Sequence, residues 1–183
     1  MYKALQNLTR ARFYAVQNLT REKQRLPKTD SISISFMCTM ESWVELLDEE
    51  IERQVRDIPN TLLSVPGIGP VLCAGILAEV GDINRFNGQA ALAKYAGLAW
   101  SQDPSRLIKS GNRFLKHYLC AAAYSMVRSD AEFKRYYDVK YKEVEKYPHD
   151  RALVLTARKL VRLVFRLIKD GEGYEQTPVY ARK

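Results

Sequence analysis

Hydrophobic residues recur every three or four positions through the first part of the chain, as on one face of an amphipathic helix. Within residues 2–25 a six-residue sequence nearly repeats after eleven residues, so that Leu5 to Arg10 is echoed by Val16 to Arg21. A repeat of this length returns equivalent side chains to the same helix face. The pattern predicts a long basic helix whose apolar face needs a partner helix.

The partner helix is predicted between Glu41 and Arg56, where apolar side chains again follow helical spacing. Pro27 is expected to end the first helix. The stretch from Ser31 to Phe36 alternates like a strand, but no second strand is evident to pair with it, so we interpret it as a linker. Together the two helices predict an antiparallel, coiled-coil-like arm over residues 1–57.

From residue 58 the pattern changes to shorter apolar segments separated by Gly and Pro. Residues 59–81 predict a short helix, a tight glycine turn, and an apolar helix that starts at Pro70 and closes at Gly81. Four more helices are predicted, with a loop over residues 98–108, and they span 89–95, 112–128, 130–146 and 150–169. We therefore expect an all-α protein in which a compact helical domain, residues 58–183, follows the arm.

Composition and charge narrow the function classes. The 183 residues carry a net charge of +8, with 46% hydrophobic and 27% charged residues, as in ordinary globular proteins. No apolar run approaches the roughly 20 residues of a membrane span, and no apolar signal core opens the chain. The three cysteines lie far apart, which favours reduced, mostly buried thiols of an intracellular protein. The positive excess indicates a polyanionic partner, most simply nucleic acid.

The residues around the glycine turn resemble a helix-hairpin-helix motif. Gly67 and Gly69 permit a tight turn, and the following helix begins at Pro70. Exposed backbone N–H groups at such a helix end can bind a phosphate oxygen without reading base sequence. The alternative is a turn that serves only helix packing.

The last predicted helix separates its charges from its apolar residues. At about 100° per residue, its basic residues share one narrow face, and they are Arg151, Arg158, Arg162, Arg166 and Lys169. Apolar side chains populate the opposite side, where we expect the core. The basic face is either a DNA-backbone contact or a solubilising surface. A second basic cluster comprises Lys109, Arg113 and Lys116.

No metal site is predicted within the chain. The acids between Asp48 and Glu52 cluster on the arm helix, where a solvated face is the favoured interpretation. The two histidines, His117 and His149, and the three cysteines are too far apart in the sequence to predict a zinc site.

Several segments, in order, resemble the C-terminal domain of insertion-sequence 110-family transposases, also described as bridge-RNA-guided serine recombinases. These segments are Ser64–Val71, Phe86–Leu98, Lys109–Leu115, Lys140–Val144 and His149–Phe165. The resemblance covers residues 58–170, and the arm resembles the helical linker that precedes this domain. We therefore interpret the chain as a truncated transposase with its linker.

This resemblance implies a two-domain enzyme. A resolvase-like N-terminal domain would bind Mg²⁺ through acidic residues, and a serine of the C-terminal domain would attack a DNA phosphodiester. Nothing in this chain resembles the acidic domain, so we expect no cofactor in this chain itself and Mg²⁺ only with the missing domain.

Aligning the spacing after Gly97 and Leu98 places Ser105 at the position of the family's serine, with Ser101 as the alternative. The family has glycine after this serine, whereas here Arg106 follows. Both serines are also consistent with ordinary loop residues.

The expected partners are DNA and a second copy of the chain bound through the arm, with no membrane. The resemblance further implies a structured guide RNA and a cytoplasmic, nucleoid-associated protein of a bacterium or archaeon. Two alternatives stay open: a non-catalytic helix-hairpin-helix module that binds nucleic acid, and an inactive transposase remnant acting through self-association.

Overall fold

The computed structural model of the chain describes residues 2–26, 30–99 and 110–175. Within these ranges the protein consists of seven α-helices and two 3-10 turns, without a strand, which confirms the all-α prediction. The elements are α1 Tyr2–Arg25, α2 Ser31–Arg56, η1 Leu62–Ser64, α3 Pro70–Val80, η2 Ile83–Arg85, α4 Gln89–Tyr95, α5 Arg113–Ser129, α6 Ala131–Lys142 and α7 Pro148–Asp170.

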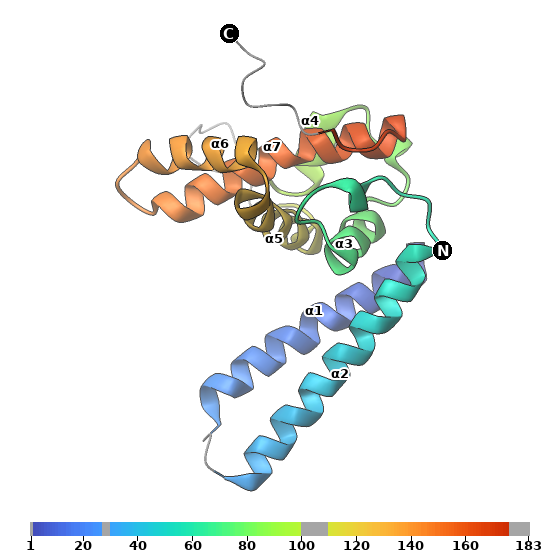
Figure 1. The fold of residues 1–183 in the computed structure, drawn as a ribbon, viewed down its shortest axis with the longest axis vertical. Helices are drawn as coiled ribbons and strands as arrows, with labels where there is room; N and C mark the ends of the chain where they lie inside the picture. The colour runs from blue at the N-terminus through green and yellow to red at the C-terminus, as the bar shows by residue number, and fades with distance from the viewer. Residues whose placement is uncertain (1, 27–29, 100–109, 176–183) are drawn as a thin grey trace.

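Helices α1 and α2 form an antiparallel hairpin, here called the arm, that projects from the other helices (Figure 1). Helix α1 has the predicted bounds. The predicted linker over Ser31–Phe36 is wrong, because α2 already begins at Ser31. The carboxylate of Asp30 accepts a hydrogen bond from the backbone N–H of Ser33 at 2.9 Å and so caps the helix. This local cap outweighs the strand-like alternation that follows it.

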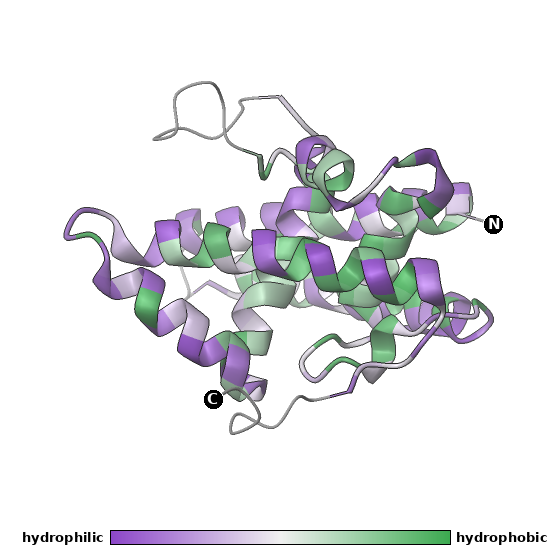
Figure 2. Cartoon of the chain, turned by 90° about the horizontal axis from the view of Figure 1, so that it is seen from above, coloured by the Kyte–Doolittle hydropathy of each residue, from purple (hydrophilic) through white to green (hydrophobic). Residues whose placement is uncertain are grey.

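The remaining elements, from η1 to α7, form the body. Helix α7 lies antiparallel to α6, α5 packs beneath both of them, and α3 packs against α5 (Figure 1). Every residue of α3 from Cys73 to Val80 is buried, as expected for a helix that is apolar on all sides. Hydrophobic and hydrophilic residues alternate along the outer helices, each of which turns one face to the core (Figure 2). The division into two domains at residue 57 stays a prediction.

Several boundaries differ from the predicted ones. Helix α7 begins at Pro148, two residues earlier than predicted, because proline fits the first turn of a helix, where its missing N–H is not needed. Helix α6 ends at Lys142, four residues earlier than predicted. Before the glycine turn the chain forms only the three-residue 3-10 turn η1 instead of a short α-helix. The helix-hairpin-helix resemblance is therefore not confirmed.

The arm is fixed to the body around a buried carboxylate. The side chain of Glu79 on α3 is fully buried and accepts hydrogen bonds from Nε and Nη2 of Arg10 at 2.7 and 2.9 Å. These hydrogen bonds raise the pKa of Arg10. The hydroxyl of Tyr118 on α5 donates to the backbone oxygen of Thr9 at 2.7 Å. Helix α1 is thus tied to two body helices by polar contacts that also bury apolar surface.

Within the described residues, none of the helices is both long enough and apolar enough to cross a membrane.

Candidate nucleic-acid interface

Helix α7 presents its predicted basic face to solvent. Arg151, Arg162, Arg166 and Lys169 are exposed, and Arg158 is half-buried. The two acids of the helix lie at the ends of this face, with Asp150 about 100° from Arg151 and Asp170 about 40° from Arg166. The predicted core side is confirmed by burial, since Leu160, Val164 and Leu167 are at most 1% exposed.

A hydrogen bond joins the basic face to another described element. The Nζ of Lys169 donates to Oδ1 of Asn84 at 3.4 Å, which is a neutral acceptor. From Arg151 to Lys169 the face extends about 27 Å along the helix axis. This length matches several successive phosphates of one nucleic-acid strand.

The two glycines of the turn before α3 have different surroundings: one packs against α5, and the other faces solvent. Gly67 has a φ of +88°, and a Cβ there would lie 2.9 Å from Oγ of Ser125, so α5 fills this side of the turn. Gly69 has an ordinary φ of −78° and is exposed, and no side chain caps the helix that it precedes. Of the two predicted glycines, Gly69 is exposed and Gly67 is half-buried, and the turn and its packing explain Gly67.

The second predicted basic cluster lies at the start of α5. Arg113 is exposed and Lys116 is half-buried, whereas Lys109 lies outside the described residues. The side chain of Asn112 caps α5 by accepting hydrogen bonds from the N–H groups of Phe114 and Leu115, both at 3.0 Å. Its Nδ2 donates to Glu79 at 2.6 Å. The buried carboxylate therefore positions the helix end that carries Arg113.

Two glycines bring the ends of the segment between α4 and α5 together. A Cβ on Gly111 would lie 2.5 Å from the backbone nitrogen of Gly97, which is closer than side-chain carbons approach other atoms. The backbone N–H of Asn112 donates to the oxygen of Tyr95 at 2.7 Å. The candidate nucleophiles Ser105 and Ser101 belong to this segment and lie outside the described residues.

No group of three or more His, Cys, Asp or Glu side chains that could hold a metal ion occurs in residues 2–26, 30–99 and 110–175. The acids of α2 instead form ion pairs, such as Glu50 with Arg53 at 2.6 Å. The described residues therefore do not fit the Mg²⁺ site that the family resemblance implies for a separate acidic domain.

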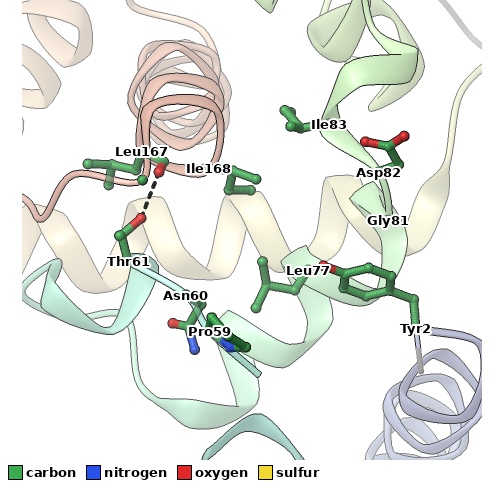
Figure 3. A pocket seen from close by; sticks show the side chains of 11 residues that line it. Tyr2, Pro59, Asn60, Thr61, Leu77, Gly81, Asp82, Ile83, Leu167 and Ile168 are labelled. Carbon is green, nitrogen blue, oxygen red and sulfur yellow. Dashed lines mark hydrogen bonds between the residues drawn. The ribbon is translucent and has the colours of Figure 1, made fainter. Parts of the chain in front are cut away.

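A pocket of about 640 Å³ lies between the N-terminal end of α1 and the C-terminal ends of α3 and α7 (Figure 3). Leu77, Ile83 and Ile168 make it largely apolar, and the hydroxyl of Thr61 donates to the oxygen of Leu167 at 2.8 Å. None of the predicted nucleic-acid-binding residues lines this pocket. It is thus separate from the basic face of α7.

Sequence reasoning missed Glu79, Arg10 and Tyr14, which organise the contact between arm and body. The signal for Glu79 was present, because it is the one charged residue of an otherwise apolar α3. A carboxylate buried in this way needs a cationic or hydrogen-bonding partner.

Residues 60–138 match the family model described as Transposase IS116/IS110/IS902 family. The chain is 33% identical over 129 residues to the insertion element IS110 uncharacterized 43.6 kDa protein of Streptomyces coelicolor, a match that covers 67% of this chain and 31% of that protein. It is 27% identical over 176 residues to the insertion element IS116 uncharacterized 44.8 kDa protein of Streptomyces clavuligerus, which covers 86% of this chain and 43% of the relative.

A shorter match, 47% identical over 58 residues, joins the chain to the mini-circle putative transposase for IS117 of Streptomyces coelicolor, and covers 31% of this chain and 14% of that protein. The matches thus span less than half of the length of these curated relatives. The family model and all three relatives agree on one kind of mobile element. The chain therefore belongs to the IS116/IS110/IS902 transposase family.

Proposed function

We propose that this chain is the nucleic-acid-binding part of an insertion-sequence transposase and that it binds the DNA backbone through the basic face of α7. The observation that carries the proposal is the separation of charge on α7. Its exposed face holds the cations Arg151, Arg162 and Arg166 with no acid between them, and its buried face anchors the helix in the core. The similarity to a putative transposase of IS117 supports DNA as the substrate.

The binding should be mainly electrostatic and largely independent of sequence. Long, exposed arginine side chains on a straight helix face reach phosphates more readily than base edges. Neutralising phosphates releases condensed counterions, so the affinity should fall steeply with salt. Structured RNA is the second candidate ligand, because it presents the same phosphate groups as DNA. A guide RNA would bind through the same contacts.

The test is a triple variant, Arg151→Ala, Arg162→Ala and Arg166→Ala, measured by fluorescence anisotropy on duplex DNA over a salt series. The slope of log affinity against log salt should decrease by about 3, because each lost phosphate contact contributes about 0.9. The matched control removes three arm cations that are paired with acids, Lys23, Arg53 and Arg56. Equal losses in both triple variants would show that only net charge matters and would contradict the proposal.

For strand transfer we propose Ser105, with Ser101 as the alternative, as the nucleophile. Its Oγ would bond to phosphorus while the bond to the deoxyribose oxygen breaks, and that oxygen would leave as a hydroxyl carrying a proton. This step needs the acidic domain, whose Mg²⁺ would stabilise charge on the phosphoryl group. Denaturing electrophoresis of the chain with DNA, Mg²⁺ and a resolvase-like acidic domain, as the family resemblance implies, should show a covalent adduct that Ser105→Ala removes.

A second proposed role is self-association through the arm. Four large apolar side chains of α2 are exposed at heptad spacing, and their exposed fractions are Ile32 80%, Phe36 49%, Trp43 67% and Leu46 62%. Spacings of three, four and seven residues are those of a coiled-coil seam. The buried residues Ser33 and Ile51 belong to a different face of α2, which is turned away from this exposed seam. A second copy would cover the exposed seam.

Light scattering during size-exclusion chromatography tests this role. The double variant Trp43→Ser and Leu46→Ser should elute as a monomer at concentrations where the wild-type chain is a dimer. The control changes two exposed apolar residues of the body, Leu63→Ser and Val139→Ser. A wild-type chain that is monomeric at high concentration would contradict self-association.

A further inference from the structure

Aromatic rings and arginines gather where α1 crosses the N-terminal end of α5. This junction cluster consists of Phe13, Tyr14, Arg113, Phe114 and His117. The guanidinium of Arg113 lies 5.7, 5.3 and 4.9 Å from the ring centroids of Phe13, Tyr14 and Phe114. All three distances are within the range of cation–π attraction. One arginine of the body therefore contacts rings of both the arm and the body.

The junction cluster is held in one arrangement by hydrogen bonds. Nη2 of Arg113 donates to the hydroxyl of Tyr14 at 2.6 Å. The guanidinium of Arg10 lies 4.5 Å from the ring centroid of Phe114 and is fixed by Glu79. A ligand that binds here meets side chains whose rotamers are already restricted, so little conformational entropy is lost on binding.

The junction cluster is open to solvent. Tyr14 is 45% exposed, and Arg113 and His117 are exposed. A shallow depression of about 480 Å³ adjoins it, lined by Arg10, Tyr95, Gly111, Asn112, Arg113 and Phe114. The cluster therefore offers ring and guanidinium surface beside a space that the protein does not fill.

The charges around the junction cluster favour an anion. Helix α5 contains the cations Arg113, Lys116 and Arg128 and no acid, and the only acid of α1 is Glu22. Glu79 accepts a hydrogen bond from Asn112, which lines the depression, and its charge is paired with that of Arg10. Among the described residues, Arg113 forms no ion pair with an acid. A ligand that is both flat and anionic matches this surface, and a nucleotide has both properties.

We propose that the junction cluster is a stacking site for an unpaired base of a bound nucleic acid. The base would stack on the ring of Tyr14 and the guanidinium of Arg113, and Lys116 would contact a flanking phosphate. The base must be unpaired, because the ring faces of a duplex are covered by neighbouring base pairs. The inference rests on the proposed nucleic-acid binding and gives the arm a direct part in it.

The experiment measures how tightly the wild-type chain and the Tyr14→Leu variant bind DNA. Each protein is tested with a single strand and with the duplex that contains the same strand. Leucine keeps the apolar bulk but removes the π face, so single-strand affinity should fall about tenfold and duplex affinity less than about twofold. The control is Tyr2→Leu, a 36% exposed tyrosine of the same helix that lines the pocket of Figure 3. Circular dichroism verifies that both variants stay folded.

Two further variants separate stacking from charge. Tyr14→Phe keeps the ring and should bind single strands within about twofold of wild type. Arg113→Lys keeps the charge but loses the planar guanidinium, so it should weaken single-strand binding without changing the salt slope.

The inference is overturned if Tyr14→Leu binds single strands as well as Tyr2→Leu does, or if it loses duplex affinity equally. Should these results occur while the α7 triple variant still loses affinity, the proposed function stands and the stacking site alone fails. A wild-type chain that binds neither single strands nor duplex would overturn both.

Discussion

The arm and the body differ in how completely they bury their apolar residues. In the body, α3 is surrounded by other helices, and its residues from Cys73 onward are buried on every side. In the arm, α2 packs on α1 and, through residues such as Ile51 and Val55, against the body, but Trp43 on its outer side is 67% exposed. The body is therefore a closed core, whereas the arm has an apolar surface still available to a partner. The same type of substitution should have different consequences in the two regions.

The largest difference is expected for leucine-to-alanine changes. Leu160→Ala in the body removes a side chain that is 0% exposed and should lower the free energy of unfolding by about 3 kcal/mol. Leu46→Ala in the arm changes a side chain that is 62% exposed and should lower it by less than about 0.5 kcal/mol in the monomer. Urea denaturation at low protein concentration measures both. Similar losses at the two positions would show that the arm has a closed core as well.

A smaller effect is expected at the contact between the two regions. Glu79→Gln removes the charge that Arg10 meets but keeps an acceptor for Asn112, so unfolding should become easier by about 2 kcal/mol. Hydrogen exchange in α1 should rise as well, because the arm is held less firmly. The matched control is Glu50→Gln in the exposed pair with Arg53, where no measurable loss is expected. A Glu79 variant as stable as the control would mean that apolar packing alone joins arm and body.

The smallest expected effect is a pH dependence of the folding stability, which arises at the same contact between arm and body. The His117 side chain is exposed, but its ring packs against Phe13 and Tyr118. This partial desolvation, helped by the charge of Arg12, lowers the pKa of His117 below the ordinary 6.5. The unfolded chain therefore takes up a proton near pH 6.5, and the folded protein does so only at lower pH. Stability should decrease as the pH falls from 7 through 6.5. His117→Gln should remove this part of the slope in thermal melts, and an unchanged slope would assign it to other groups.

Where local pattern decides the structure, the sequence was sufficient. The eleven-residue repeat predicted α1, and the angular spacing of arginines predicted which face of α7 would be exposed. The prediction from sequence was wrong at the start of α2. Asp30 caps a helix there, in a stretch whose Ser and Ile residues alternate like a strand. The junction cluster was also missed. Tyr14 and Arg113 are 99 residues apart in sequence, and no local pattern indicates that α1 crosses α5.

The glycine pair at the foot of the segment between α4 and α5 has a consequence for evolution. Because Gly97 and Gly111 already hold the two ends in contact, the helices on either side are fixed whatever the length of the chain between them. Loop-closure entropy rises only logarithmically, and doubling a loop costs about 0.6 kcal/mol. Insertions and deletions between these glycines should therefore be tolerated by the fold. The position of the candidate serine can change among relatives while the surrounding helices stay the same.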